Sequence, residues 1–185
     1  VQERVDGVTH LASLVDSSYG DDAIIFADYL RESGGTEMLA ELLLDPEPYI
    51  QQKLLMVIGN LASDAFDSNS AATKAIFKEN DIMARVQPFL TSHEWVTQLY
   101  AAAAVQNLVK DIELAKEALS LGMHKAVQKL LRSEQELVVR YAAGALKNLS
   151  DARELEVEEA AGERKGLMSR LKPKRRLELG AEAQE

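Results

Sequence analysis

A pattern that occurs three times constrains the fold of this chain more than any other feature of its sequence. The pattern ends in Asn-Leu, with an aliphatic residue two positions before the Asn and small or aliphatic residues farther back. It occupies three segments: 53–64, 100–111 and 141–151. The successive Asn residues, at 60, 107 and 148, are 47 and 41 residues apart. Self-similarity at a period of about 40 residues is typical of stacked helical repeats.

Two further segments precede each copy of the pattern. The nearer one carries a Leu at a constant distance from the Asn, at Leu43, Leu90 and Leu131. The farther one is shorter and ends in Gly or Asn-Asp, residues that tolerate the left-handed conformation after a helix. Apolar residues recur at helical spacing in all of these segments and do not alternate strictly. Each unit is therefore predicted to consist of three amphipathic helices.

We predict one all-α domain over 1–185, built as a stack of these units. It is divided into a partial unit, three full units and a charged capping segment: 1–20, 21–67, 68–113, 114–151 and 152–185. A cap is expected because an end of a repeat stack needs a polar outer face. The aliphatic stripe of the third helices is predicted to be buried: Ile58, Leu61, Val105, Leu108, Leu146 and Leu149.

The three-helix unit and its Asn-Leu ending resemble the armadillo repeat family over roughly residues 1–150. The resemblance implies an α-solenoid, a right-handed superhelix of about three repeats whose third helices line a concave groove. It also implies a scaffold or adaptor that binds another protein, without catalysis by the repeats. Import receptors of this family carry Trp four residues before the Asn. Met56, Ala103 and Gly144 stand there in this chain, so recognition of nuclear-import signals is not supported.

The repeated Asn suggests how a partner is held. A side-chain amide has donors and an acceptor, so it can pair with either group of an extended peptide backbone. The alternative role is to tie its own helix to a neighbouring one. Lys53, Tyr100 and Tyr141 each stand seven residues before an Asn and form a second row. Tyr is typical of binding hot spots, and it is equally typical of the edge of a core. Ser13 takes the place of Asn in the partial unit. The predicted partner-binding residues are Ser13, Lys53, Asn60, Tyr100, Asn107, Tyr141 and Asn148.

Composition narrows the range of partners and locations. The net charge is −9, and because the charges of 152–185 balance, all of it falls on 1–151. This negative charge argues against nucleic acid, which needs clustered cations. It suits a basic protein or peptide, although a solvated acidic surface is the commoner explanation. The absence of Cys excludes disulfides and cysteine-bound zinc. No apolar run approaches the ~20 residues of a membrane span. We expect a cytoplasmic or nuclear protein.

No motif in the sequence indicates catalysis. Phosphate-binding loops and the paired His of metalloproteases are missing, so we expect no cofactor, metal or small-molecule substrate. The basic cluster at 172–176 fits a nuclear-import signal or a contact for an acidic surface. Two alternatives to a general scaffold stay open. Residues 11–39 loosely resemble armadillo-type nucleotide-exchange cofactors of heat-shock chaperones, and the chain could also dock a larger enzyme or assembly factor.

Overall fold

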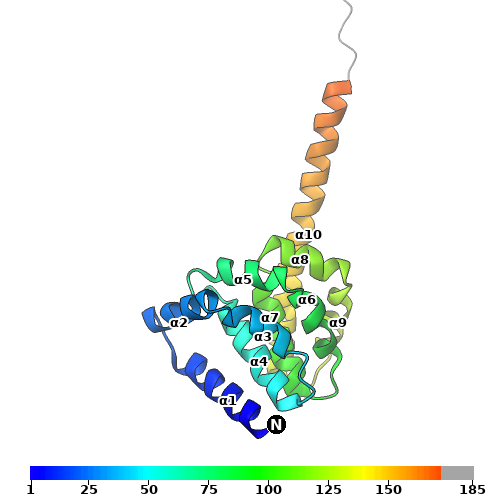
Figure 1. Cartoon of the computed structure of the whole chain (residues 1–185). Coiled ribbons are helices and arrows are strands. Elements are labelled where there is room, and N and C mark those ends of the chain that lie inside the picture. Colours follow the sequence, from blue (N-terminus) through cyan, green and yellow to red (C-terminus); the bar gives the residue numbers. More distant parts are fainter. Residues whose placement is uncertain (172–185) are drawn as a thin grey trace, which may run out of the picture. The chain divides into compact units, whose positions relative to one another are not determined.

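The computed structural model describes the backbone of residues 1–171 and the side chains of 1–155, 157, 158 and 161. Within residues 1–171 the chain forms ten α-helices and one 3-10 helix, with no strand (Figure 1). The predicted all-α fold is thus confirmed. The helices are α1 (Gln2–Ser17), α2 (Asp21–Glu32), α3 (Gly35–Leu42), α4 (Pro48–Leu61), α5 (Ser70–Glu79), α6 (Ile82–Val86), η1 (Gln87–Thr91), α7 (Trp95–Leu108), α8 (Ile112–Ser120), α9 (Met123–Leu130) and α10 (Glu136–Leu171).

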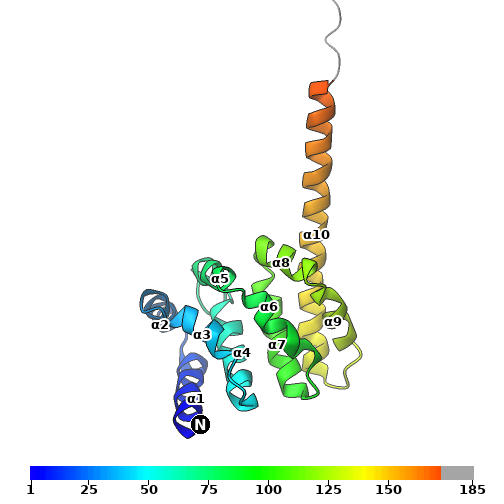
Figure 2. The ribbon, with the colours of Figure 1, turned by 45° about the vertical axis from the view of Figure 1, so that its right-hand side comes forward.

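These helices follow the predicted triplets. The first full unit is α2, α3 and α4, the second is α5, α6 with η1, and α7, and the third is α8, α9 and the first part of α10. Helix α1 is the third helix of the partial unit. Figure 2 shows α1, α4, α7 and the start of α10 side by side, so the third helices form one layer of the stack. Helix α8 begins at Ile112, slightly before the predicted start of its unit at residue 114.

A left-handed residue separates the first two helices of every unit. Gly34, Asp81 and Gly122 have φ angles of 75°, 53° and 70°. Residues without a β-branch, and Gly above all, reach this region at least cost, which explains why the first helices end in Gly or Asn-Asp. The same backbone turn in three units is structural evidence for the repeat.

The predicted stripe forms the centre of the core. Ile58, Leu61, Val105 and Leu108 are at most 1% exposed, and Leu149 is 2% exposed. Leu146 was predicted to be buried but is only half-buried. It lies on α10, the third helix of the last unit, and no further third helix packs on α10 within residues 1–171.

The chain divides into two compact units, Val1–Ala152 and Arg153–Glu185, and helix α10 runs through the boundary between them. In the second unit Leu155 and Val157 are 51% and 64% exposed. The role of 152–185 as a charged cap stays a prediction. The basic cluster at 172–176 lies outside the described residues.

Helices α4 and α7 approach each other at Gly59. A Cβ atom on Gly59 would lie 3.2 Å from Cα of Ala104 and 3.3 Å from its backbone nitrogen. Backbone atoms cannot move aside without moving the helix, so Gly59→Val should push α7 away and cost about 1–3 kcal/mol of stability. Chemical denaturation would measure this loss.

Gly144 provides the matched control, because a Cβ atom there would meet the side chain of Gln106 and no backbone. A flexible side chain can move, and Ala suits a helix interior better than Gly by about 0.5–1 kcal/mol. Gly144→Ala should therefore be nearly neutral or slightly stabilising. Equal losses for the two variants would contradict the close approach of α4 and α7.

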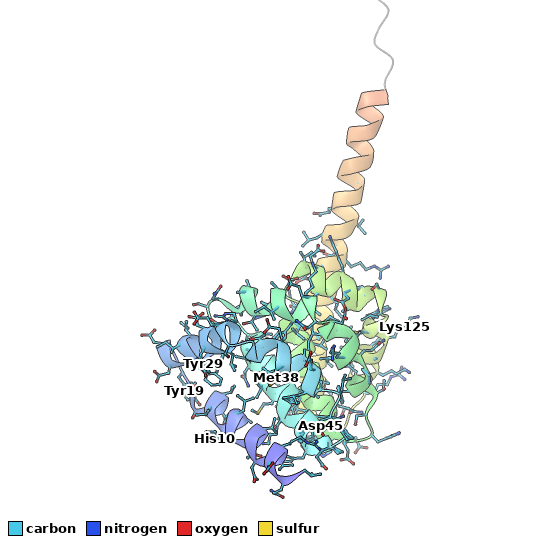
Figure 3. All side chains as sticks on the ribbon, viewed as in Figure 1. His10, Tyr19, Tyr29, Met38, Asp45 and Lys125 are labelled. Atoms are coloured by element: carbon cyan, nitrogen blue, oxygen red, sulfur yellow. The ribbon has the colours of Figure 1, made fainter. Side chains whose placement is uncertain are left out.

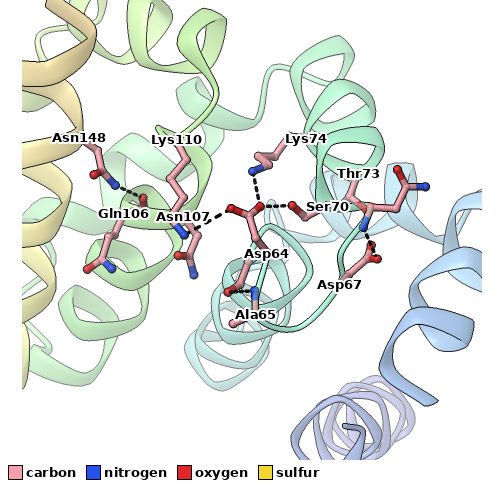
Figure 4. A network of polar contacts seen from close by, with 12 residues as sticks. Asp64, Ala65, Asp67, Ser70, Thr73, Lys74, Gln106, Asn107, Lys110 and Asn148 are labelled. Atoms are coloured by element: carbon pink, nitrogen blue, oxygen red, sulfur yellow. Dashed lines mark hydrogen bonds and ion pairs between the residues drawn. The ribbon is translucent and has the colours of Figure 1, made fainter. Parts of the chain in front are cut away.

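A buried ion pair joins α2 to the loop between α4 and α5. Nη1 of Arg31, on α2, donates to Oδ2 of Asp67 at 2.5 Å and to Oγ1 of Thr73 at 2.6 Å. The Arg31 side chain is 9% exposed and that of Asp67 is 0% exposed. Asp67 also accepts a hydrogen bond from the backbone nitrogen of Asn69 at 2.8 Å (Figure 4). The loop between α4 and α5 is thereby fixed against α2.

Candidate protein-binding groove

The layer of third helices contains a cavity of about 190 Å³, which we call the central cavity. It is lined by residues of α4, α7 and α10: Leu55, Met56, Gly59, Asn60, Leu99, Tyr100, Ala103, Asn107, Leu137 and Tyr141. Four of the seven residues predicted from the sequence therefore lie together. They are brought there because equivalent positions of successive third helices face the same side of the stack.

The three Asn amides also make hydrogen bonds inside the protein. Nδ2 of Asn107 donates to the carbonyl oxygen of Gly59 on α4 at 2.9 Å. Nδ2 of Asn148 donates to the carbonyl oxygen of Gln106 on α7 at 2.8 Å (Figure 4). In both cases the acceptor carbonyl belongs to the residue that directly precedes the Asn of the previous unit. Asn107 and Asn148 thus tie neighbouring third helices together, which was the alternative role.

This structural role leaves much of each amide unused. A side-chain amide has two N–H donors and an acceptor oxygen, and only one donor is engaged in Asn60, Asn107 and Asn148. Their Oδ1 atoms accept no hydrogen bond from any residue that the structure describes. One amide can therefore hold a neighbouring helix and still present a donor and an acceptor to a ligand.

Asn60 departs from this arrangement, since its Nδ2 donates to the carbonyl of Met56 in its own helix at 3.0 Å. The equivalent acceptor on α1 would be the carbonyl of Ala12. We attribute the difference to Val57, which stands where the later units have Ala104 and Ala145. A larger side chain leaves less room for a facing helix than the Ala of the later units.

The other three predicted residues do not line the central cavity. Lys53 is half-buried, and its Nζ lies 5.4 Å from the centre of the Tyr49 ring, a cation–π contact. Asn148 is one unit farther along the stack. Ser13 is exposed on α1, and its hydroxyl makes no hydrogen bond to another described residue. Their role in partner binding stays a prediction.

A second cavity, of about 230 Å³, was not predicted; we call it the N-terminal cavity. It is lined by residues of α1, the α1–α2 loop, α2, α4 and the α4–α5 loop: Val15, Asp16, Ser18, Tyr19, Gly20, Ala23, Asn60, Ser63, Ala65 and Phe66. Figure 3 labels Tyr19, which is 76% exposed. Asn60 lines both cavities, so the two cavities lie next to each other at α4.

Comparison with known proteins identifies the fold. No family model and no curated relative matches the sequence. Among solved structures, a designed armadillo repeat protein superposes with a TM-score of 0.66 at 20% identity, over 79% of this chain and 58% of that one. The chain has an armadillo-like helical repeat fold. A crystal structure of an engineered protein from the Northeast Structural Genomics Consortium gives a TM-score of 0.68 at 21% identity, over 80% of this chain. This chain spans 58% of the designed protein and 56% of the engineered protein, little more than half of each.

In this armadillo-like stack an ionic cluster lies in the loop that follows α4. The carboxylate of Asp64 accepts a hydrogen bond from Oγ of Ser70 and another from Nζ of Lys74 at 3.1 Å (Figure 4). Nζ of Lys110 lies 3.6 Å from Oδ2 of Asp64. The Ser70 hydrogen bond, followed by the two lysines, holds the pKa of Asp64 below its ordinary value of 3.8 despite partial desolvation. The α4–α5 loop is thereby joined to α5 and to the end of α7.

The lowered pKa predicts a pH dependence of stability. A carboxylate whose pKa is lower in the folded state stabilises the protein above its unfolded pKa, and this contribution disappears as the pH falls through the folded pKa. Asp64 is 59% exposed, so the effect should be small, at most about 1 kcal/mol. Urea denaturation should find Asp64→Asn less stable than the wild type at pH 7, and the difference should shrink as the pH falls below the ordinary Asp pKa of 3.8 and through the lower folded pKa. A difference that stays constant over this range would mean that the charge of Asp64 is not responsible.

The rest of the described chain has a further cavity and no site for a metal ion. A cavity of about 370 Å³ lies between η1 and α9, and none of the predicted residues lines it. Among residues with described side chains, no group of three or more His, Asp or Glu is placed to hold a metal ion. No helix in this part of the protein is both long and apolar enough to cross a membrane.

Proposed function

We propose that this chain is a protein-binding scaffold whose third helices hold an extended segment of a partner polypeptide. One observation carries the proposal. Asn60 and Asn107 line the same cavity as Tyr100 and Tyr141, and both amides keep an unused donor and acceptor. This set combines groups that pair with a peptide backbone and large rings that contact its side chains.

The dimensions of the stack suit an extended ligand. Packed helices lie about 8–10 Å apart, and an extended chain rises about 3.3 Å per residue. One unit would then face about three ligand residues. Asn Oδ1 would accept a backbone N–H of the partner and the free Nδ2 proton would be donated to a backbone C=O. This pairing ignores the partner's side chains, so the lining of the cavities supplies the selectivity.

The proposal is of binding without catalysis, as is typical of scaffolds with this fold. The cytoplasmic or nuclear location, the exchange-cofactor role and the role of docking a larger enzyme or assembly factor stay predictions. None of these is favoured by a specific contact among the described residues.

Blocking the groove without cutting its internal hydrogen bonds tests the proposal. Ala103 is half-buried, lines the central cavity and lies one turn before Asn107 on α7. Ala103→Arg should fill the cavity and weaken partner binding by about tenfold or more, as expected when an interface contact worth about 1–3 kcal/mol is lost. Ala84→Arg is the matched control, because Ala84 is exposed on α6 and lines none of the three cavities.

Pull-down from a cell lysate with the three proteins, read by mass spectrometry, would select partners bound by the wild type and the control alone. The affinity of each selected partner would then be measured with purified proteins. Equal affinity for both variants and the wild type, with folding confirmed by circular dichroism, would place the binding surface elsewhere.

A further inference from the structure

The two cavities along the third helices differ in charge. No Asp, Glu, Lys or Arg lines the central cavity, whose walls are formed by Leu, Met, Ala, Gly, Tyr and Asn. Transfer of an ammonium or guanidinium group into such a site would cost desolvation free energy without a compensating charge. A large apolar side chain would instead gain about 25 cal/mol for each Å² that it buries. The central cavity therefore favours an apolar side chain.

The N-terminal cavity contains one charged side chain, the carboxylate of Asp16. Asp16 forms no ion pair or hydrogen bond with the side chains of other described residues. Tyr19, on the same wall, offers an exposed aromatic ring over which a cation can lie. By charge complementarity this cavity favours Lys or Arg.

Asn60 fixes the distance between the two sites, because it lines both cavities. The cavities thus lie on either side of α4, one between α1 and α4 and the other between α4 and α10. The central cavity extends across α7 to α10, so the centres of the two cavities are separated by about one and a half helix spacings of 8–10 Å, roughly 12–15 Å. An extended chain covers that distance in about four residues.

From these observations we infer that the partner segment carries a large apolar residue and, about three to five positions away, a Lys or Arg. The inference rests on the proposed function and adds the chemistry of the ligand to it. The acidic net charge of −9 had suggested a basic partner in general. The lining of the groove assigns the basic residue to the N-terminal cavity and excludes it from the central one.

Selection from random linear peptides displayed on phage tests the inference without knowledge of the natural partner. The whole chain would be used as bait, in the wild-type form and as Asp16→Lys and Ala103→Asp. We expect wild-type bait to enrich peptides that carry the apolar and basic pair at this spacing. Asp16→Lys should replace the Lys or Arg with Asp or Glu and keep the apolar residue. Ala103→Asp should replace the apolar residue with Lys or Arg.

A matched control and an affinity measurement complete the test. Asp22→Lys has the same charge change as Asp16→Lys at an exposed residue that lines neither cavity, and it should leave the selected pattern unchanged. Against a synthetic peptide of the wild-type pattern, Asp16→Lys should lower the affinity about two- to fivefold or more, the range of a solvent-exposed ion pair.

The outcomes separate this inference from the proposed function. Peptides that lose binding to Ala103→Arg but lack the pair, or whose pattern is the same for all baits, would overturn the inference and leave the groove intact. If no peptide binds in the groove, both the inference and the proposed function are wrong.

Discussion

Replacing Leu108 with alanine should destabilise the protein by about 2–5 kcal/mol, the usual cost of truncating a fully buried Leu. Leu108 is 0% exposed on α7, which lies between α4 and the start of α10 in the third-helix layer (Figure 2). Because the side chain is fully buried, its truncation leaves a cavity in the core. A loss of this size is a large share of the 5–15 kcal/mol by which a domain is typically stable.

Leu146→Ala is the comparison. Leu146 lies on α10 at the repeat position of Val105, three residues before the position that Leu108 occupies. It is half-buried, so it has fewer contacts to lose and its truncation should cost clearly less than that of Leu108. Urea denaturation followed by circular dichroism would give both free energies. Similar values for the two variants, or a neutral Leu108→Ala, would contradict the packing described for α7.

Removing the cation of the buried ion pair should have an effect of similar size. In Arg31→Met the carboxylate of Asp67, which is 0% exposed, would lose its hydrogen-bonded counter-ion in the interior. Breaking a buried pair from one side typically costs about 3–5 kcal/mol, because the remaining charge stays desolvated. We expect this loss in urea denaturation at neutral pH.

The double variant Arg31→Met with Asp67→Leu supplies the control. It removes both charges, so it should recover much of the stability that the single variant loses. Asn69 would still lose a hydrogen-bond acceptor, which limits the recovery. A double variant no more stable than Arg31→Met would show that the pair acts through the loop geometry and not through its charges.

The fold could be predicted because the same pattern of residues occurs in three units. The constant position of Leu43 and Leu90 before their Asn corresponds to two residues that are 2% and 1% exposed. Leu131, at the same position of the last unit, is 40% exposed. Periodicity identifies which face of a helix points inward, but it does not show where the stack ends and stops covering that face.

The candidate site was predictable in part. The register of the repeat places Asn60, Asn107, Tyr100 and Tyr141 at one cavity, and their role in binding stays a prediction. Their hydrogen bonds were not predictable, because they depend on how closely two helices approach, which small residues such as Gly59 and Ala104 decide. Asn60 and Asn107 are identical in the pattern yet bond to different helices for this reason.

Features outside the repeat pattern were missed. Asp16 lies in the last turn of α1 and Tyr19 in the loop after it, and the buried pair joins Arg31 to the α4–α5 loop. Such contacts bring together residues that are far apart in the chain and occur once, so no periodic signal marks them. The run of Asp16, two Ser and Tyr19 before Gly20 was a visible turn signal, although nothing in it indicated a cavity.

The side-chain amides of the three Asn residues offer the most direct test of the central claim, that the third helices bind a partner's backbone. Their N–H resonances can be followed by nuclear magnetic resonance in the wild-type protein, so no helix contact needs to be cut. On titration with a peptide selected by the wild-type chain, the resonances of Asn60 and Asn107 should shift in a saturable way. Shifts confined to other parts of the surface, with both amides unchanged at saturation, would contradict the account.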